Sequence, residues 1–295
     1  KALCDILTAA RIENENLSFD FTRWEEEKTH VVGGKDHKRA LKILKDMHPL
    51  HFPVAFPEVF LRERKGFDVI LGNPPWEEAT VEKLGFWARF APGLRGLTQR
   101  EKETQIRGLR DSRPDLVQEL KLEVETARVV RNALSRGPFP GMGTGDPDLY
   151  KAFMWRFWFL AGERGGWIGV VLPRSAFAAK GSEEFRWRVF KRARNIDLTV
   201  LLNTGRWAFD MESRYTFALV AIERKEPDAG DTTVYLEGPY NSHSSYESRP
   251  ENGGASFTGK EVLSWNESAS LPLLPSKNSI DVFAHLKRAP RLDTD

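Results

Sequence analysis

The residues with the clearest potential for chemistry form an Asn-Pro-Pro-Trp loop at positions 73–76, directly after the apolar run at 67–71. A short, largely β-branched run that follows a charged stretch is typical of a strand buried on both faces of a parallel sheet. Gly72 and two consecutive prolines cannot continue a central strand. A rigid loop therefore begins at the carboxyl end of the expected strand, where open α/β sheets place their ligands.

The functional groups of this loop suit transfer of a group to a planar amine, which is a poor nucleophile because its lone pair is delocalised. Asn73 offers a side-chain carbonyl, and Pro74, which has no N–H, offers its backbone carbonyl. Pro74 and Pro75 hold the loop in one shape, and Trp76 presents a flat face. Stacking on such a face is worth about 1–3 kcal/mol for a base extruded from a duplex. The alternative is a tight turn after a strand, with Trp76 packed on the surface.

The segment FDVILGNPPW at 67–76 resembles motif IV of the amino methyltransferases that modify adenine N6 in DNA. The aromatic, proline-rich segment at 51–60 is similar to the corresponding part of type IIG restriction-modification enzymes and related phage-defence methyltransferases. The resemblance implies a site-specific DNA adenine-N6 methyltransferase, with S-adenosyl-L-methionine as methyl donor and double-stranded DNA as partner. It also implies catalytic roles for Asn73, Pro74, Pro75 and Trp76, with Asn73 contacting the cofactor as well.

A second segment, GDPDLYKAFMWRFWFLAGERGGWIGVVLPRSAF at 145–177, divides into a start signal, a helix at about 148–161, a glycine break and a strand at 167–172. It resembles motifs V and VI of the same enzymes. By that resemblance Phe153 lies against the adenine of S-adenosylmethionine. The alternative is a core position, because Phe153, Phe157 and Leu160 recur at helical spacing.

Two further apolar runs, at 196–202 and 215–222, are joined by a polar loop and predict an antiparallel pair of strands. An edge hairpin of this kind is typical of methyltransferase sheets, whose last strand inserts antiparallel between two others. The family carries motif VIII in the loop. Phe209 is our first choice for the ring that stacks on the flipped base opposite Trp76, and Trp207 is the second. Either aromatic could instead anchor the loop to the core.

The glycine-rich loop that holds the cofactor's methionine end in this family has no counterpart before Phe67. Gly33 and Gly34 lie between charged segments, without the strand and helix that such a loop requires. The chain also begins with Lys1. We therefore expect a piece of a longer protein that starts after the glycine motif, with the rest of the parent polypeptide, its cofactor half and its recognition or nuclease domains, as a partner.

The expected fold class is α/β, a partial Rossmann-like S-adenosylmethionine-dependent methyltransferase sheet flanked by helices. Residues 1–66 form a mostly helical lead-in, and 67–226 form the catalytic region with a helical insertion near 98–136. At 227–295 glycine, serine, asparagine and proline accumulate, which indicates the start of a target-recognition region. No DNA-reading residue can be named there.

Composition bounds the class of protein. The chain has 295 residues, 40% of them hydrophobic, with a net charge of +2 and one cysteine, which fits a globular enzyme of a reducing compartment, the cytoplasm. No apolar run is long enough for a membrane span, and no histidine, cysteine and carboxylate cluster has metal-ligand spacing. Because the net charge is only +2, any phosphate contacts must come from local clusters of cations. The candidates are the cations of the expected helix near 183–194, namely Arg186, Arg188, Lys191, Arg192 and Arg194. The alternative is that these cations form a solvated helix face.

Two other functions remain open from the sequence. Methyltransferases of protein glutamine amides or of ribosomal RNA guanine amines also use NPPY-like loops, because their nucleophile is again a planar amine. From a different class, the chain could be an inactive DNA-binding or scaffold fragment.

Overall fold

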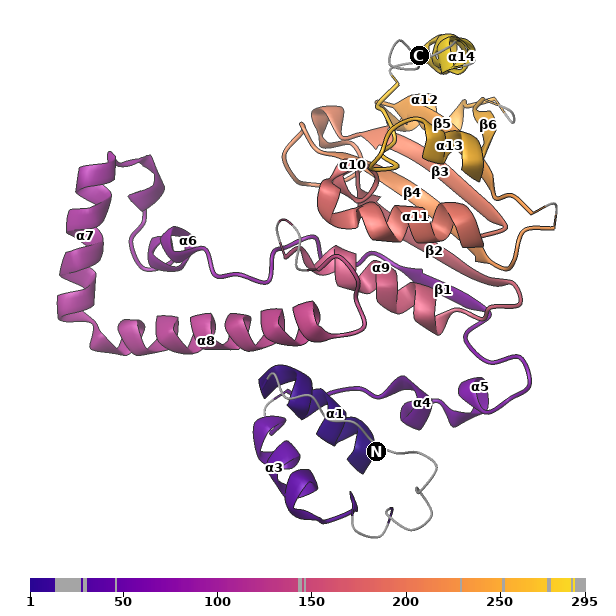
Figure 1. The fold of residues 1–295 in the computed structure, drawn as a ribbon. Helices are drawn as coiled ribbons and strands as arrows, with labels where there is room; N and C mark the ends of the chain where they lie inside the picture. The colour runs from indigo at the N-terminus through magenta and orange to yellow at the C-terminus, as the bar shows by residue number, and fades with distance from the viewer. Residues whose placement is uncertain are drawn as a thin grey trace, which may run out of the picture. The chain divides into compact units, whose positions relative to one another are not determined.

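The computed structural model describes residues 1–13, 28, 31–45, 47–142, 145, 147–228, 230–250, 253–274, 277–287 and 289. It divides into two compact units, each built from two stretches of chain (Figure 1). The first unit comprises Lys1–Leu50 and Glu78–Pro138, and the second comprises His51–Glu77 and Phe139–Asp295. The units do not follow the consecutive boundaries expected from the sequence, because residues 78–138 cluster with the first fifty residues.

The first unit is helical. Its elements are α1 (Ala2–Glu13), α3 (Lys35–Ile43), α6 (Lys83–Ala88), η2 (Leu94–Gly96), α7 (Gln99–Ser112) and α8 (Pro114–Arg136). Helices α7 and α8 occupy the stretch for which the sequence predicts a helical insertion. Thr98 and Glu101 form a reciprocal capping box at the start of α7, and Pro114 occupies the first turn of α8, where its missing N–H costs nothing.

The second unit is built on one mixed six-stranded sheet with the order β1-β2-β4-β3-β5-β6. Its strands are β1 (Val69–Gly72), β2 (Gly166–Pro173), β3 (Asn195–Leu202), β4 (Thr216–Arg224), β5 (Thr233–Tyr240) and β6 (Ala255–Thr258). Strands β1 and β2 pair in parallel, as do β3 and β5, whereas β4 runs antiparallel to both β2 and β3. The predicted antiparallel pair is confirmed. Its expected place at the edge was wrong, because β5 and β6 continue the sheet beyond β3.

The remaining elements of this unit are helices and single turns. They are α4 (Phe52–Ala55), α5 (Pro57–Phe60), α9 (Leu149–Leu160), α10 (Ser175–Ala178), η3 (Lys180–Ser182), α11 (Glu183–Arg192), η4 (Thr204–Arg206), α12 (His243–Glu247), α13 (Gly259–Ser264) and α14 (Lys277–Lys287). Helix α9 and strand β2 match the predicted helix and strand to within one or two residues. The connection between β5 and β6 carries α12, so the sheet extends past the boundary expected near residues 227–231.

Strand β1 differs from the expected strand in its burial. Val69 is 57% exposed and Leu71 is 79% exposed, so the prediction of a strand buried on both faces was wrong. The reason is position: within the described residues β1 pairs with β2 alone and forms one edge of the sheet. Edge strands usually avoid such exposed apolar side chains.

The start of β1 is held by aromatic packing and by close backbone contact. Phe67 contacts the rings of Phe52, Phe56 and Phe60 edge to face, at centroid distances of 5.5 to 6.2 Å. Its backbone also pairs with the end of α9, since Phe67 N donates to Leu160 O at 2.8 Å and Phe67 O accepts from Gly162 N at 2.9 Å. A Cβ at Gly166 would lie 2.4 Å from Gly162 N, so this glycine permits the crossing of the two backbones.

Helix α11 contains a buried cation that the sequence placed among the candidate phosphate contacts. Arg186 is fully buried and donates to the carbonyls of Ala176, Ala179 and Ser268, at 2.8 to 3.2 Å. Burial lowers the pKa of its guanidinium to about 10, which leaves it charged at neutral pH. Arg186 therefore ties α11 to two other segments and cannot reach a phosphate.

We expect Arg186→Met to lower the free energy of unfolding by about 3–5 kcal/mol, because three buried carbonyls lose a charged donor. The matched control is Arg192→Met on the same helix, where a 59% exposed side chain pairs with Glu226, and the cost should stay below about 1 kcal/mol. Urea denaturation followed by circular dichroism measures both. Equal costs for the two variants would contradict the structural role of Arg186.

Candidate functional site

The Asn-Pro-Pro-Trp loop begins at the last residue of β1 and ends beside the first residue of α9. Asn73 is exposed and Pro74 is buried. The carbonyl of Glu77 accepts a hydrogen bond from Leu149 N at 2.8 Å, which fixes the end of the loop to the start of the helix. The carbonyls of Asn73 and Pro74 thus belong to a loop that is held at both ends.

Three aromatic rings from three parts of the chain meet at the carboxyl end of β1. Trp76 lies 6.1 Å from Phe209 at an interplanar angle of 73°, and 6.3 Å from Phe217 at 38°. Phe209 and Phe217 are 4.9 Å apart at 70°. Phe209 comes from the loop between β3 and β4, and the buried Phe217 belongs to β4, opposite Pro173 and Leu201. The structure thus brings together Trp76 and Phe209, the two rings that the sequence predicts to face each other.

Asn203 organises the loop that carries Phe209. This side chain is fully buried directly after β3. Its Nδ2 donates to Phe209 O at 2.9 Å, and its Oδ1 accepts from Phe209 N at 3.1 Å, so it binds the backbone of one residue on both sides. Longer contacts join it to Ala208 and Met211. A buried amide with both ends satisfied fixes where the Phe209 ring sits.

Trp207, the second choice for the stacking ring, is turned to other partners. Its Nε1 donates to Leu202 O at 2.7 Å, and its ring contacts His243 and Tyr246 of α12, with centroids 6.3 and 6.5 Å away. The structure shows no ring contact between Trp207 and Trp76. Among the described contacts, Trp207 anchors the loop, which is the alternative that the sequence left open for one of these aromatics.

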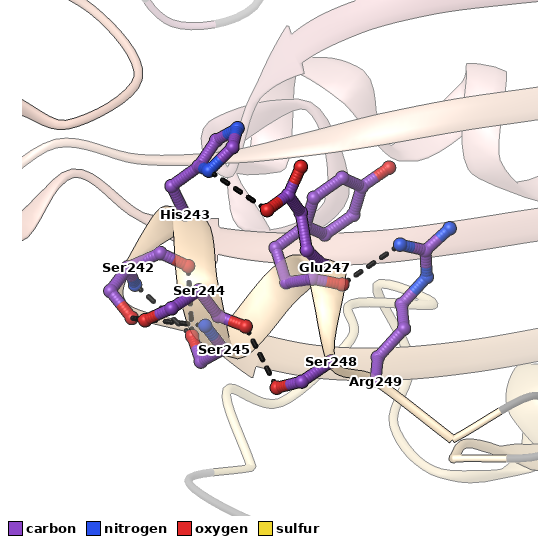
Figure 2. A network of polar contacts seen from close by, with 8 residues as sticks. Ser242, His243, Ser244, Ser245, Glu247, Ser248 and Arg249 are labelled. Atoms are coloured by element: carbon purple, nitrogen blue, oxygen red, sulfur yellow. Dashed lines mark hydrogen bonds and ion pairs between the residues drawn. The ribbon is translucent and has the colours of Figure 1, made fainter.

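Helix α12 is kept in place by its own polar contacts (Figure 2). Ser242 and Ser245 form a reciprocal capping box at its start, and His243 Nδ1 lies 3.3 Å from Glu247 Oε2. At its end the guanidinium of Arg249 lies 4.2 Å from the centre of the Tyr246 ring and donates to Tyr246 O at 2.8 Å. The helix is only five residues long, so these contacts give it the rigidity that support of Trp207 requires.

The aromatic site is closed in this structure. A base between two rings needs about 7 Å between parallel planes, twice the carbon–carbon contact distance of about 3.5 Å. Trp76 and Phe209 are too close and too steeply inclined for that. In addition, Trp76 Nε1 is buried without a hydrogen-bond partner in the described part of the chain. Because an unpaired buried N–H costs about 1–3 kcal/mol, the closed arrangement leaves a polar group that a rearrangement could satisfy.

Phe153, the predicted cofactor contact, lies on the surface of α9. Its side chain is 37% exposed, and its ring is 5.8 Å from that of Phe157. The Phe157 ring in turn lies 3.6 Å from where a Cβ on Gly72 would be. Phe153 is therefore a partly exposed aromatic near the end of β1, and not a fully buried core residue.

Two residues of this site escaped sequence reasoning. Asn203 follows a predicted strand and precedes Thr204 and Gly205, so its position at a strand end was a usable signal. Phe217 lies within an apolar run that indicates only a strand. In the described ranges no group of three histidine, cysteine or carboxylate side chains comes close enough to hold a metal ion. None of the described helices is both long and apolar enough to cross a membrane.

Comparisons with known proteins give remote structural similarity only. No family model matches the chain, and no curated protein matches it. A modification subunit of a putative type I restriction enzyme from Vibrio vulnificus YJ016 is similar at 17% identity over 77% of this chain and 42% of that chain, with a TM-score of 0.38. The DrdV–DNA complex is similar at 14% identity over 62% of this chain and 16% of that chain, with a TM-score of 0.31.

A third similar structure describes complex assembly and conformational transition of the type I restriction-modification system. It is 12% identical over 78% of this chain and 44% of that chain, with a TM-score of 0.37. The chain thus spans less than half the length of each of these proteins.

We expect Asn203→Ala to lower the free energy of unfolding by about 1–3 kcal/mol, because the backbone groups of Phe209 lose buried partners. Thr204→Ala, a change at the exposed neighbouring position, should have almost no effect. Urea denaturation measures the cost, and near-ultraviolet circular dichroism reports the packing of the aromatic rings. An unchanged stability in Asn203→Ala would mean that this side chain does not hold the loop.

Proposed function

We propose that the chain contributes the amine-activating part of a site-specific DNA adenine-N6 methyltransferase, of the restriction-modification or phage-defence kind, that uses S-adenosylmethionine. The observation that carries the proposal is the contact between Trp76 and Phe209 beside the exposed Asn73. A loop with two carbonyl acceptors thus lies next to two aromatic rings from separate segments. These are the groups that an enzyme needs to hold a flipped base and to activate its amine.

The chemistry assigned to the loop is activation of the amine by hydrogen-bond acceptance. Asn73 Oδ1 and the Pro74 carbonyl accept hydrogen bonds from the two N6 hydrogens, which favours the pyramidal form with a free lone pair. When bound, S-adenosylmethionine supplies an electrophilic methyl group on sulfur. With N6 held by these two acceptors, its lone pair would be directed at that methyl group, and N6 would give up a proton once it carries the methyl group. The acceptors strengthen as N6 becomes positive, so they stabilise the transition state.

The residues present fit one part of the cofactor. Phe153 offers an exposed aromatic face near the end of β1, suited to stacking of an adenine. Groups for the ribose and the methionine end are not assigned to this chain. Within the described residues β1 pairs with β2 alone, so the backbone groups of its outer edge can pair with a further strand. We propose that additional strands of the parent polypeptide pair there and supply the remaining cofactor contacts.

Binding of the base must open the aromatic site. Trp76 and Phe209 have to separate and turn toward parallel planes, and this movement would give Trp76 Nε1 access to a hydrogen-bond partner. The other candidates, methylation of a protein glutamine or of a ribosomal RNA amine, would use the same Asn73 chemistry. The second ring at Phe209 favours a nucleic-acid base over a protein glutamine, because a base gains about 1–3 kcal/mol from stacking on an aromatic ring.

In the full-length protein that contains this chain, we expect Asn73→Ala to lower the rate of methyl transfer about a hundredfold, through loss of a charge-assisted hydrogen bond in the transition state. Transfer of labelled methyl groups to unmethylated genomic DNA, ribosomal RNA and bulk protein measures the rate and the substrate class. Glu77→Gln, an exposed change beside the loop, is the control. Near wild-type turnover in Asn73→Ala would refute the proposal, and transfer to RNA or protein alone would select a rival.

The same assay separates the two aromatic residues of the β3–β4 loop. Phe209→Ala should lower kcat/KM for DNA about tenfold to a hundredfold, since one stacking face is lost, and Phe209→Tyr should keep most of the activity. Trp207→Phe should stay near wild type, because Trp207 packs on α12. If Trp207→Phe is as defective as Phe209→Ala, the stacking role does not belong to Phe209.

A further inference from the structure

A basic cleft lies at the other end of the sheet from Asn73. It has a volume of about 390 Å³ and is lined by five cationic side chains, Arg164, Arg188, Arg192, Arg224 and Lys225. Arg224 is the last residue of β4 and pairs with Gly166, the first residue of β2. Since β1 and β2 are parallel, the cleft lies at their amino ends, whereas the Asn-Pro-Pro-Trp loop follows the carboxyl end of β1.

Carboxylates compensate only part of this charge. Glu163 and Glu226 also line the cleft, and they pair with Arg224 at 2.5 Å and with Arg192 at 2.9 Å. From outside the lining, Asp228 lies 3.5 Å from Lys225 and Glu63 lies 3.7 Å from Arg164. Among the residues that the structure describes, the side chain of Arg188 makes no hydrogen bond or ion pair and lines the cleft. The Arg188 guanidinium therefore has no negatively charged partner among the described residues.

Arg224, which lies beside Arg188 in the cleft lining, is held in a fixed position. Arg224 donates to Ala161 O at 2.8 Å, and its guanidinium lies 5.2 Å from the centre of the Trp158 ring. Burial lowers the pKa of Arg224, and the charge of Arg188 lowers it further against the opposing effect of Glu163. The two guanidinium groups are thus near enough to repel each other. An anion bound between them would relieve that repulsion.

We propose that this cleft binds a phosphate-bearing anion. Guanidinium groups match phosphate oxygens with paired N–H donors, and the volume suits a di- or triphosphate or a short stretch of nucleic-acid backbone. The proposal does not depend on the methyltransferase function, because the cleft shares no residue with the aromatic site. It assigns a separate binding role to the end of the sheet at which β1 and β2 begin.

The test is isothermal titration of sodium triphosphate into the protein at low salt, with Arg188→Gln and Lys260→Gln as matched single-charge variants. Lys260 is 79% exposed on α13 and does not line the cleft. Arg188→Gln should weaken binding about tenfold, since one charge-assisted contact is lost, without lowering the Tm. Lys260→Gln should leave the affinity unchanged.

Competition with a blunt DNA duplex identifies the source of the phosphate. If the duplex displaces triphosphate and loses affinity in Arg188→Gln, the natural ligand is nucleic-acid backbone; if it does not compete, the ligand is a free polyphosphate. Absence of triphosphate binding up to about 10 mM, a concentration that marks only very weak affinity, would overturn the proposal. An equal loss of triphosphate affinity in Arg188→Gln and Lys260→Gln would also overturn the proposal, because the loss would then follow from the change in net charge alone. Neither result bears on methyl transfer.

Discussion

The antiparallel insertion of β4 between β2 and β3 is the constraint on which the candidate site depends. Because β4 runs against both neighbours, its first residues lie beside the last residues of β2 and β3. The loop from β3 into β4 must therefore turn at the same edge at which the parallel strand β1 ends. This register places Phe217 under the site and holds Phe209 beside Trp76. A parallel strand at this position would begin at the opposite edge and leave Trp76 without either ring.

The loops at the carboxyl ends of the strands are held by hydrogen bonds to backbone groups more than by apolar packing. Asn203 pairs with both backbone groups of Phe209, and the end of the Asn-Pro-Pro-Trp loop is hydrogen-bonded to the start of α9. Such fixed contacts suit a site that must present carbonyl acceptors at defined positions. The rings are the adaptable part, since no hydrogen bond fixes the orientation of Trp76, Phe209 and Phe217 relative to one another.

Local patterns in the sequence predicted α9, β2 and the β3–β4 pair, because helical and strand periodicity are short-range properties. The choice of Phe209 before Trp207 came from the resemblance to motif VIII, and no local pattern indicates that Trp207 packs on α12, more than thirty residues away. The burial of β1 could not be predicted, since an apolar run looks the same in a central strand and in an open edge. Arg186 was misread for the same reason: its carbonyl partners include Ser268, far along the chain.

The two ends of the sheet are built for different chemistry, and the direction of the strands explains why one chain can hold both. At the carboxyl ends of β1 and β2, loops offer carbonyls and aromatic faces together with charges of both signs, such as Glu77 after β1 and Arg174 after β2. At the amino ends, the start of β2 and the end of β4 lie beside the basic cleft, to which α11 contributes Arg188 and Arg192 and α9 contributes Trp158. Strand β2 spans eight residues, about 26 Å, so charges at one end are largely screened from the other at physiological salt. The amine site at one end of the sheet can therefore coexist with the basic cleft at the other end without a strong electrostatic effect of the cleft on its acceptors.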